Sequence, residues 1–161
     1  MKFLNFINDA IAKVETIVLV ILLSLMIIVG FAQVVLRNLF ETGISWADPM
    51  LRYTVLWLAF IGASLATREN RHINIDVLTR ILSLKLKKIA FILTNFFAFS
   101  ICLILLKSSI DFIKMEMEFP REIFAGFKNW MLEIIIPIGF LLMSLRFAFN
   151  ILKGILIKNI F

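Results

Sequence analysis

Four long apolar stretches dominate the hydrophobic pattern of this chain, at about 16–36, 49–67, 89–106 and 130–149. The first and the third contain no charged side chain. A helix needs about 20 predominantly apolar residues to cross the hydrocarbon core of a bilayer, and each stretch approaches that length. Because that core holds no water to satisfy an unpaired backbone group, helices are expected. The pattern predicts an all-α integral membrane protein with one membrane domain, 1–161.

Composition supports this class and excludes several functions. Hydrophobic residues make up 61% of the chain and charged residues 17%, whereas soluble domains have about 45–50% and about 25%. The spans leave only short connections, so no soluble catalytic domain is expected. The net charge of +6 comes from basic residues that flank the spans, which indicates membrane orientation and not nucleic-acid binding. His72 and Cys102 each occur once, so a bis-histidine haem, a three-histidine metal site and an internal disulfide are excluded, and no cofactor or metal is expected.

The first span could instead be a cleaved signal peptide. Its apolar run, however, exceeds the roughly 7–15 residues of a signal-peptide core. Asp9 and Glu15 also precede it, which does not fit the positively charged start of a signal peptide. We expect a retained span.

The distribution of Lys and Arg predicts the orientation, because positively charged connections stay in the cytoplasm. The connection between the second and third spans is the most basic, with Arg68, Arg71, Arg80, Lys85, Lys87 and Lys88. Both termini should then be cytoplasmic in a bacterial inner membrane, with the first and third connections outside. An aromatic belt is expected on the outer face, formed by Trp46, Phe119, Phe124, Phe127 and Trp130.

Two connections show further helical signals. At about 71–86, Ile73, Val77, Ile81 and Leu84 recur at helical spacing. This favours an amphipathic helix lying flat at the cytoplasmic interface, with its basic face toward phospholipid headgroups. The alternative is that the segment extends the third span. In the third connection, 119–130, a short interfacial helix beginning near Pro120 is also expected.

Charged residues within spans are candidates for function, because burying them in lipid is costly. Arg52 and Glu133 are the clearest, near the outer ends of their spans. Asp48 suits the N-cap of the second span and lies four residues before Arg52, so one interpretation is a local Asp48–Arg52 pair. The other is that Arg52 or Glu133 reaches a charge on another helix or subunit. Trp57, in mid-span, is interpreted as a packing residue.

The remaining polar and small residues predict helix packing and no transport pathway. The first three spans have no acidic residue near their middle. The deeper polar residues resemble groups that hydrogen-bond between helices; they are Ser24, Gln33, Asn95 and Ser144. Gly62 and Ala63, with Ala59 and Ala66, form a small-residue stripe along which a neighbouring helix can approach. Pro137 and Gly139 permit a kink in the fourth span that a neighbour could fill.

One stretch of the sequence resembles a known family. Its residues in order are Ser45-Trp46-Ala47-Asp48, Arg52-Tyr53, Trp57, Phe60-Ile61-Gly62-Ala63, Arg68-Glu69-Asn70-Arg71-His72 and Ile75-Asp76. This pattern is similar to the small, Q-type membrane subunit of tripartite ATP-independent periplasmic (TRAP) transporters. The resemblance covers the whole chain in length and span count, while the specific motif covers about 46–76. Family members often carry two consecutive acids where this chain has Asp48-Pro49.

The resemblance implies three cooperating parts. A periplasmic binding protein captures an organic acid, and a large M-type membrane subunit carries the transport pathway and the sodium sites. The small subunit packs against the large one without holding substrate. On this reading Trp46, Asp48, Arg52, Trp57, Gly62, Ala63, His72, Asp76 and Glu133 are structural or interface residues, and the chain is not an enzyme.

Two other functions compete with this one. A small multidrug-type transporter would work as a self-associating four-helix protein, but that class needs an acid embedded in its first span. A membrane enzyme would need clustered ligands or a nucleophile with a base, and a single histidine argues against it.

The orientation can be tested by labelling introduced cysteines. With Cys102 removed, cysteines at Thr42 and at Ser83 should react with an impermeant reagent from opposite sides of the membrane. Labelling of the Ser83 position from the periplasm would contradict the predicted orientation.

Overall fold

The computed structural model describes residues 2–68, 84–124 and 126–156. Its elements in chain order are α1 (Lys2–Phe40), α2 (Ala47–Arg68), α4 (Leu84–Glu118), β1 (Glu122–Phe124), β2 (Phe127–Lys128), α5 (Asn129–Glu133) and α6 (Ile135–Leu156). His72 and Asp76 lie outside the described residues. So does most of the interfacial helix predicted at about 71–86, and its last residues belong to the first turn of α4.

Four helical segments of the described chain are long and apolar enough to cross a membrane. They are Asn8–Phe40, Ala47–Arg68, Leu86–Glu118 and Asn129–Ile155. The predicted class, an all-α integral membrane protein with four spans, is therefore confirmed. Helices α1 and α4 continue well beyond the first and third apolar stretches.

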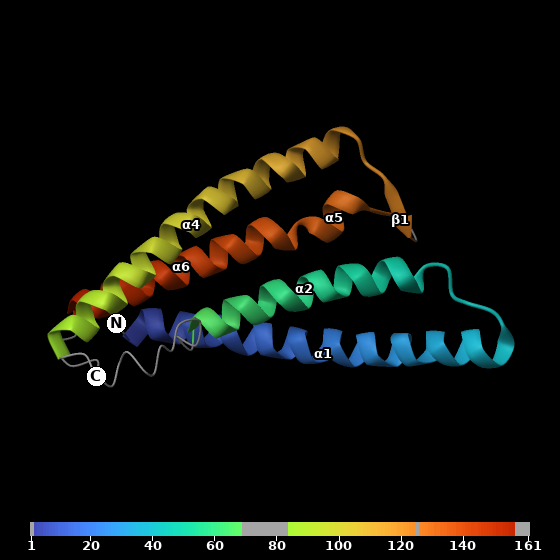
Figure 1. Ribbon diagram of the computed structural model, residues 1–161, viewed down its shortest axis with the longest axis horizontal. Coiled ribbons are helices and arrows are strands. Elements are labelled where there is room, and N and C mark those ends of the chain that lie inside the picture. The colour runs from blue at the N-terminus through green and yellow to red at the C-terminus, as the bar shows by residue number, and fades with distance from the viewer. Residues whose placement is uncertain (1, 69–83, 125, 157–161) are drawn as a thin grey trace.

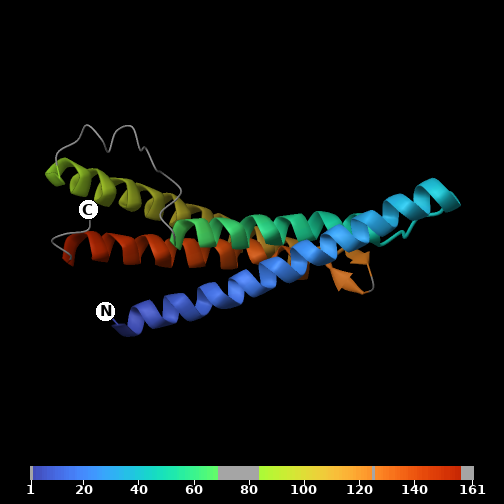
Figure 2. The same cartoon turned by 90° about the horizontal axis from the view of Figure 1, so that it is seen from below.

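The four long helices stand in a row (Figure 1). In this row α1 packs along α2, α2 also packs along α6, and α6 packs along α4. Helices α2 and α6 run in the same direction, and α1 and α4 run opposite to them (Figures 1 and 2). Because α1 and α4 lie at the edges of the row, their apolar side chains stay exposed; Phe31 is 70% exposed and Ile104 67%. Lipid or another membrane protein must cover such surfaces.

The connections group at two ends of the row. The α1–α2 connection and the β1–β2 hairpin lie at one end, whereas α1 begins and α6 ends toward the other (Figure 1). This is the arrangement of two helical hairpins side by side.

Helix α4 is longer than a membrane requires. Its 35 residues extend about 52 Å at 1.5 Å per residue, against about 30 Å of hydrocarbon. Beyond Ile104, charged side chains join the exposed apolar ones such as Ile110, Met115 and Met117. These charged residues are Lys107, Asp111, Lys114 and Glu118, at the spacing of one helical face. Lys114 and Asp111 form an ion pair at 3.6 Å. We infer that the charged part of 107–118 lies outside the hydrocarbon.

The predicted interfacial helix at 119–130 is wrong, because this segment forms a hairpin instead. Pro120 lies two residues after the end of α4 and cannot donate a backbone hydrogen bond to continue the helix. Strands β1 and β2 pair antiparallel, with Glu122 opposite Lys128. Gly126 adopts a φ of 81°, a left-handed conformation that glycine accepts readily. Its amide donates to Oε1 of Glu122 at 3.0 Å.

A break and a close contact shape the last span. Helix α5 ends at Glu133 and α6 begins at Ile135. Pro137 explains the interruption, since its ring clashes with the carbonyl four residues earlier and it lacks an N–H group. Two residues later, a Cβ atom on Gly139 would overlap with Cδ1 of Phe60. Because Gly139 has no side chain, Phe60 can pack against α6. There its ring meets the Phe140 ring edge-on, with the ring centres 5.2 Å apart.

The close contact predicts contrasting effects of two glycine substitutions. Gly139→Ala should destabilise the protein by about 1–3 kcal/mol, because the added methyl forces Phe60 from its site. Gly30→Ala is the matched control, since nothing lies within 4 Å of its Cβ position, and alanine favours a helix by about 1 kcal/mol. Thermal unfolding of the two variants in detergent measures the difference, and equal stabilities would contradict the packing described.

Candidate functional site

Helix α2 turns one narrow face toward its neighbours. Its buried residues beyond the first turn are Thr54, Ile61, Ser64 and Thr67, whose spacings of seven, three and three place them on one side of the helix. Ser64 is fully buried, with 0% of its surface exposed. A small side chain at this position leaves room for longer side chains from the helices on both sides.

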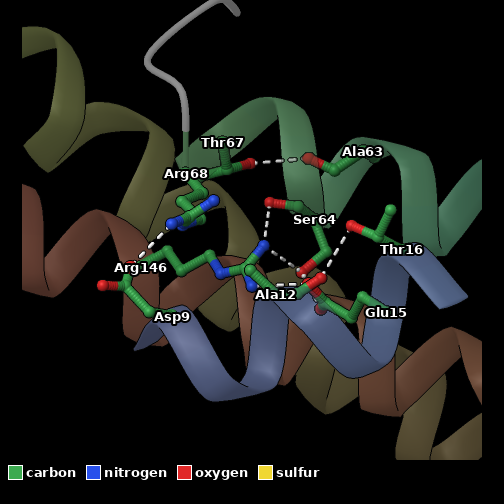
Figure 3. A network of polar contacts seen from close by, with 9 residues as sticks. All are labelled: Asp9, Ala12, Glu15, Thr16, Ala63, Ser64, Thr67, Arg68 and Arg146. Carbon is green, nitrogen blue, oxygen red and sulfur yellow. Dashed lines mark hydrogen bonds and ion pairs between the residues drawn. The ribbon is translucent and has the colours of Figure 1, made fainter. Parts of the chain in front are cut away.

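Arg146 of α6 and Glu15 of α1 meet beside Ser64 (Figure 3). Nη2 of Arg146 lies 2.5 Å from Oε2 of Glu15. Nη1 donates to Oγ of Ser64 at 2.9 Å and to the Ser64 backbone carbonyl. The Ser64 hydroxyl donates in turn to Oε1 of Glu15 at 2.8 Å. We call Glu15, Ser64 and Arg146 the buried cluster.

The electrostatics of the buried cluster are balanced. The charges of Glu15 and Arg146 cancel, and the two side chains are only 8% and 6% exposed. Both carboxylate oxygens accept a hydrogen bond. A buried pair offsets its desolvation only with good geometry and full hydrogen bonding, and charge-assisted bonds to a guanidinium meet that requirement. Removing either charge would leave the other buried without compensation.

Further polar contacts continue from the buried cluster toward the end of α2. Nδ2 of Asn150 on α6 approaches the Thr67 carbonyl at 3.5 Å. Arg68, at the last residue of α2, pairs with Asp9 of α1 at 2.6 Å, and both side chains are partly exposed. These contacts tie α1, α2 and α6 together along about two turns.

The chemistry available to this site is structural. The guanidinium of Arg146 is committed to protein oxygens, so it is not free to bind a substrate anion. Within the described residues, no group of three or more His, Cys, Asp or Glu side chains is placed to hold a metal ion. The buried cluster is therefore best understood as a clamp between helices.

Trp57 and Glu133 connect α2 to α5. The indole Nε1 of Trp57 donates to the Leu132 carbonyl at 2.8 Å, at the place where the α5–α6 break disturbs the helical hydrogen bonds. Trp57 thus adds a hydrogen bond to the packing role expected for it. Oε1 of Glu133 accepts a bond from the Tyr53 hydroxyl at 3.3 Å, while Oε2 is buried without a partner among the described residues.

The first turn of α2 differs from its prediction. Helix α2 begins at Ala47, so Asp48 lies within the first turn, where its charge favours the helix dipole. Asp48 and Arg52 are both exposed, and in the described part of the chain the expected Asp48–Arg52 pair does not form. Trp46 is 45% exposed at the start of this helix.

The small residues of α2 lie partly toward α1. A Cβ atom on Gly62 would lie 4.0 Å from Leu19 of α1, which is ordinary contact. The carbonyl of Ala63 accepts a hydrogen bond from the Thr67 hydroxyl within α2.

Gln33 of α1 holds the α1–α2 connection, because its Oε1 accepts a hydrogen bond from the Ile44 amide at 2.9 Å.

Two polar residues expected to bond between helices bond within their own. Nδ2 of Asn95 donates to the Phe91 carbonyl and Oγ of Ser144 to the Leu141 carbonyl, each at 2.8 Å. Such short side chains reach the carbonyl three or four residues earlier on the same helix. Sequence reasoning cannot distinguish this local bond from an interhelical one.

The residues of the buried cluster were not singled out by the sequence. Glu15 lies just before the predicted first span, and Arg146 lies near the end of the fourth. A usable signal was present, since opposite charges near the start of the first span and the end of the fourth can pair within the membrane. Ser64 lies among the small residues of α2 and bonds to both Glu15 and Arg146.

The buried cluster predicts a marked asymmetry between two ion pairs. Arg146→Gln should destabilise the protein by about 3–5 kcal/mol, because Glu15 is left buried and unpaired. Asp9→Asn should cost no more than about 1 kcal/mol, because the Asp9–Arg68 pair is partly exposed. Adding Glu15→Gln to Arg146→Gln should recover part of the loss. Denaturant unfolding of the solubilised protein measures these differences, and equal effects at both pairs would contradict the clamp.

Comparison with known proteins identifies the family. Residues 26–156 match the model for the DctQ component of tripartite ATP-independent periplasmic transporters; this range includes Ser64 and Arg146 but not Glu15. A Haemophilus influenzae protein, provisionally named as a TRAP transporter small permease, is 45% identical over 74 residues, 46% of this chain and 44% of that protein. The C4-dicarboxylate TRAP transporter small permease protein DctQ of Pseudomonas aeruginosa is 25% identical over 170 aligned positions, covering 85% of this chain and 80% of that protein.

A third relative is a much larger protein. The isethionate TRAP transporter permease protein DctMQ of Oleidesulfovibrio alaskensis is 22% identical over 102 residues, which are 63% of this chain but only 16% of that permease. The chain spans less than half of the first relative and most of the second. Since the family model matches well over half of its residues, this four-span membrane protein belongs to the DctQ family of TRAP transporter small permease components.

Proposed function

We propose that this chain is the accessory subunit that packs against and stabilises a large, M-type transport subunit. The complex would use an ion gradient, sodium in this family, to take up an organic acid delivered by a periplasmic binding protein. The chain would lie in the bacterial inner membrane with both termini in the cytoplasm, and it would catalyse no reaction of its own.

The larger relative supports lateral packing. In the DctMQ permease, the part similar to this chain makes up 16% of one polypeptide, so it is covalently joined to a much larger permease. A covalent junction holds two membrane parts close together. The exposed apolar edges of the row, on α1 and α4, are surfaces against which such a neighbour could pack.

The buried cluster is the observation that carries the proposed role. Transport by alternating access needs one bundle to stay fixed while another moves. The Arg146–Glu15 pair at 2.5 Å joins α1 and α6 beside Ser64 of α2, which suits a fixed bundle. We propose that Trp46, Asp48 and Arg52 set the outer boundary of this subunit and that Gly62, Ala63 and Glu133 serve helix packing. His72 and Asp76 would lie at the inner surface.

A self-associating four-helix transporter is the second candidate. The exposed apolar edges of the row favour it, because they could pack against another copy of the chain as well as against a large subunit. A transporter of this kind would need an acidic residue within the membrane to bind the coupling ion. Glu15 is paired with Arg146, so its carboxylate is not available for that role.

Reconstitution separates the two candidates. Proteoliposomes should contain this chain, the large subunit from the same genome, or both, with the binding protein outside and a sodium gradient. Labelled C4-dicarboxylate, isethionate and sialic acid are the probes, since relatives are named for these compounds. We expect uptake of one probe only when both membrane proteins are present. Uptake by this chain in isolation would contradict the accessory role and support the alternative, and full uptake by the large subunit by itself would also contradict it.

A further inference from the structure

Three lysines gather where α4 begins and α6 ends. At this place the two helices touch, because a Cβ atom on Gly154 would lie 2.9 Å from Cγ1 of Ile92 and 3.3 Å from Cδ1 of Phe91. Lys87 and Lys88 precede those two residues by four positions, so they lie on the same face of α4, one turn nearer its start.

The opposite helix supplies the third lysine and a contact. Nζ of Lys88 donates to the Ile155 carbonyl of α6 at 3.5 Å. Lys153 of α6 neighbours Gly154 and holds its Nζ 4.5 Å from the centre of the Phe149 ring. We call Lys87, Lys88 and Lys153 the lysine trio.

The lysine trio lacks acidic partners within the described chain. No acidic residue occurs in 77–110 or in 134–161. The acidic side chains described near this end, Asp9 and Glu15, are already paired with Arg68 and Arg146. The opposite end of the row differs, because Lys114 pairs with Asp111 and Arg121 with Glu116. Three positive charges at one end therefore call for an external anion.

The surroundings of the lysine trio indicate what kind of anion fits. Exposed apolar side chains flank the lysines on both helices; they are Leu86, Ile89, Leu152 and Ile155. The lysine stems can lie along this apolar surface while the ammonium groups reach the headgroup level. A ligand for this surface needs a negative head and an apolar tail.

We propose that the lysine trio binds the phosphate of an anionic phospholipid, with an acyl chain against the apolar side chains of α4 and α6. Clusters of basic residues at the cytoplasmic end of membrane helices attract anionic headgroups in this way. The site lies at the end of the row opposite the hairpin, where an inner-leaflet lipid would reach it in the proposed orientation. This inference rests on the proposed orientation of the chain and not on its role in transport.

Titration of the purified protein with short-chain phosphatidylglycerol tests the site, with thermal unfolding as the readout of binding. Phosphatidylcholine of the same chain length and inorganic phosphate are the comparison ligands. The variant Lys87→Gln/Lys88→Gln/Lys153→Gln should bind phosphatidylglycerol at least tenfold more weakly. Each lysine near an anionic surface contributes about fivefold, since about 1 kcal/mol corresponds to that ratio.

A matched control loses the same number of positive charges toward the other end of the helix row. In Lys107→Gln/Lys114→Gln/Lys128→Gln the affinity should stay within threefold of the unsubstituted protein. Replacing the lysine trio with arginines should keep the affinity, which separates loss of charge from loss of fold. Equal weakening in both glutamine variants would overturn the site. Stabilisation by inorganic phosphate as strong as by phosphatidylglycerol would overturn its assignment to a lipid.

Discussion

A guanidinium buried among membrane helices must find partners, and this requirement organises one half of the structure. Arg146 meets it by bonding to Glu15 on α1 and to Ser64 on α2. Both partners come from other helices, so α6 can satisfy its arginine only when α1 and α2 are in register with it. A serine at position 64 is small enough to let the long side chain pass and polar enough to join the bonding. Helix association in lipid relies on such polar and close contacts, because burial of apolar surface gives little advantage there.

The row of helices explains why this clamp matters. A closed bundle would fix its helices by contacts on several sides, whereas here the edge helices each have one main neighbour. Helix α4 depends on α6, through close contacts such as Gly154 with Phe91 and Ile92. Helix α1 depends on α2 and on the buried cluster. Wide apolar surfaces remain on the outer sides of the row, and lipid or another membrane protein must cover them.

Hydropathy predicted the four spans but not how far their helices continue. The apolar stretches had to be helical because hydrocarbon leaves no alternative. Where the hydrocarbon stops, however, the backbone of α4 continues as helix to Glu118, and hydropathy does not detect such an extension. In 119–130 the apolar and aromatic residues after Pro120 suggested a helix, but the chain forms a hairpin that turns through the positive φ of Gly126.

The candidate residues were predicted with similarly mixed success. Trp57 and Glu133 were singled out, and each contacts another helical element. Their partners could not be named, because residues 75 to 80 positions apart meet only through the register of packed helices. Glu15 and Arg146 lay close to the predicted span ends, where charges are usually solvated. Their burial depends on how deep each helix sits relative to its neighbours, which one sequence does not specify.

We propose that the buried cluster keeps α1, α2 and α6 as one rigid unit during transport. Ile17 of α1 and Leu145 of α6 are exposed beside the buried cluster. Spin labels at these two positions, in a chain lacking Cys102, report the distance between α1 and α6 directly. The pair should be measured by pulsed electron resonance in the complete membrane-embedded complex, with and without sodium and substrate. If the unit is rigid, the distance between the two labels should show one narrow distribution that is the same in every condition. A distribution that shifts or splits when substrate and sodium are added would contradict it.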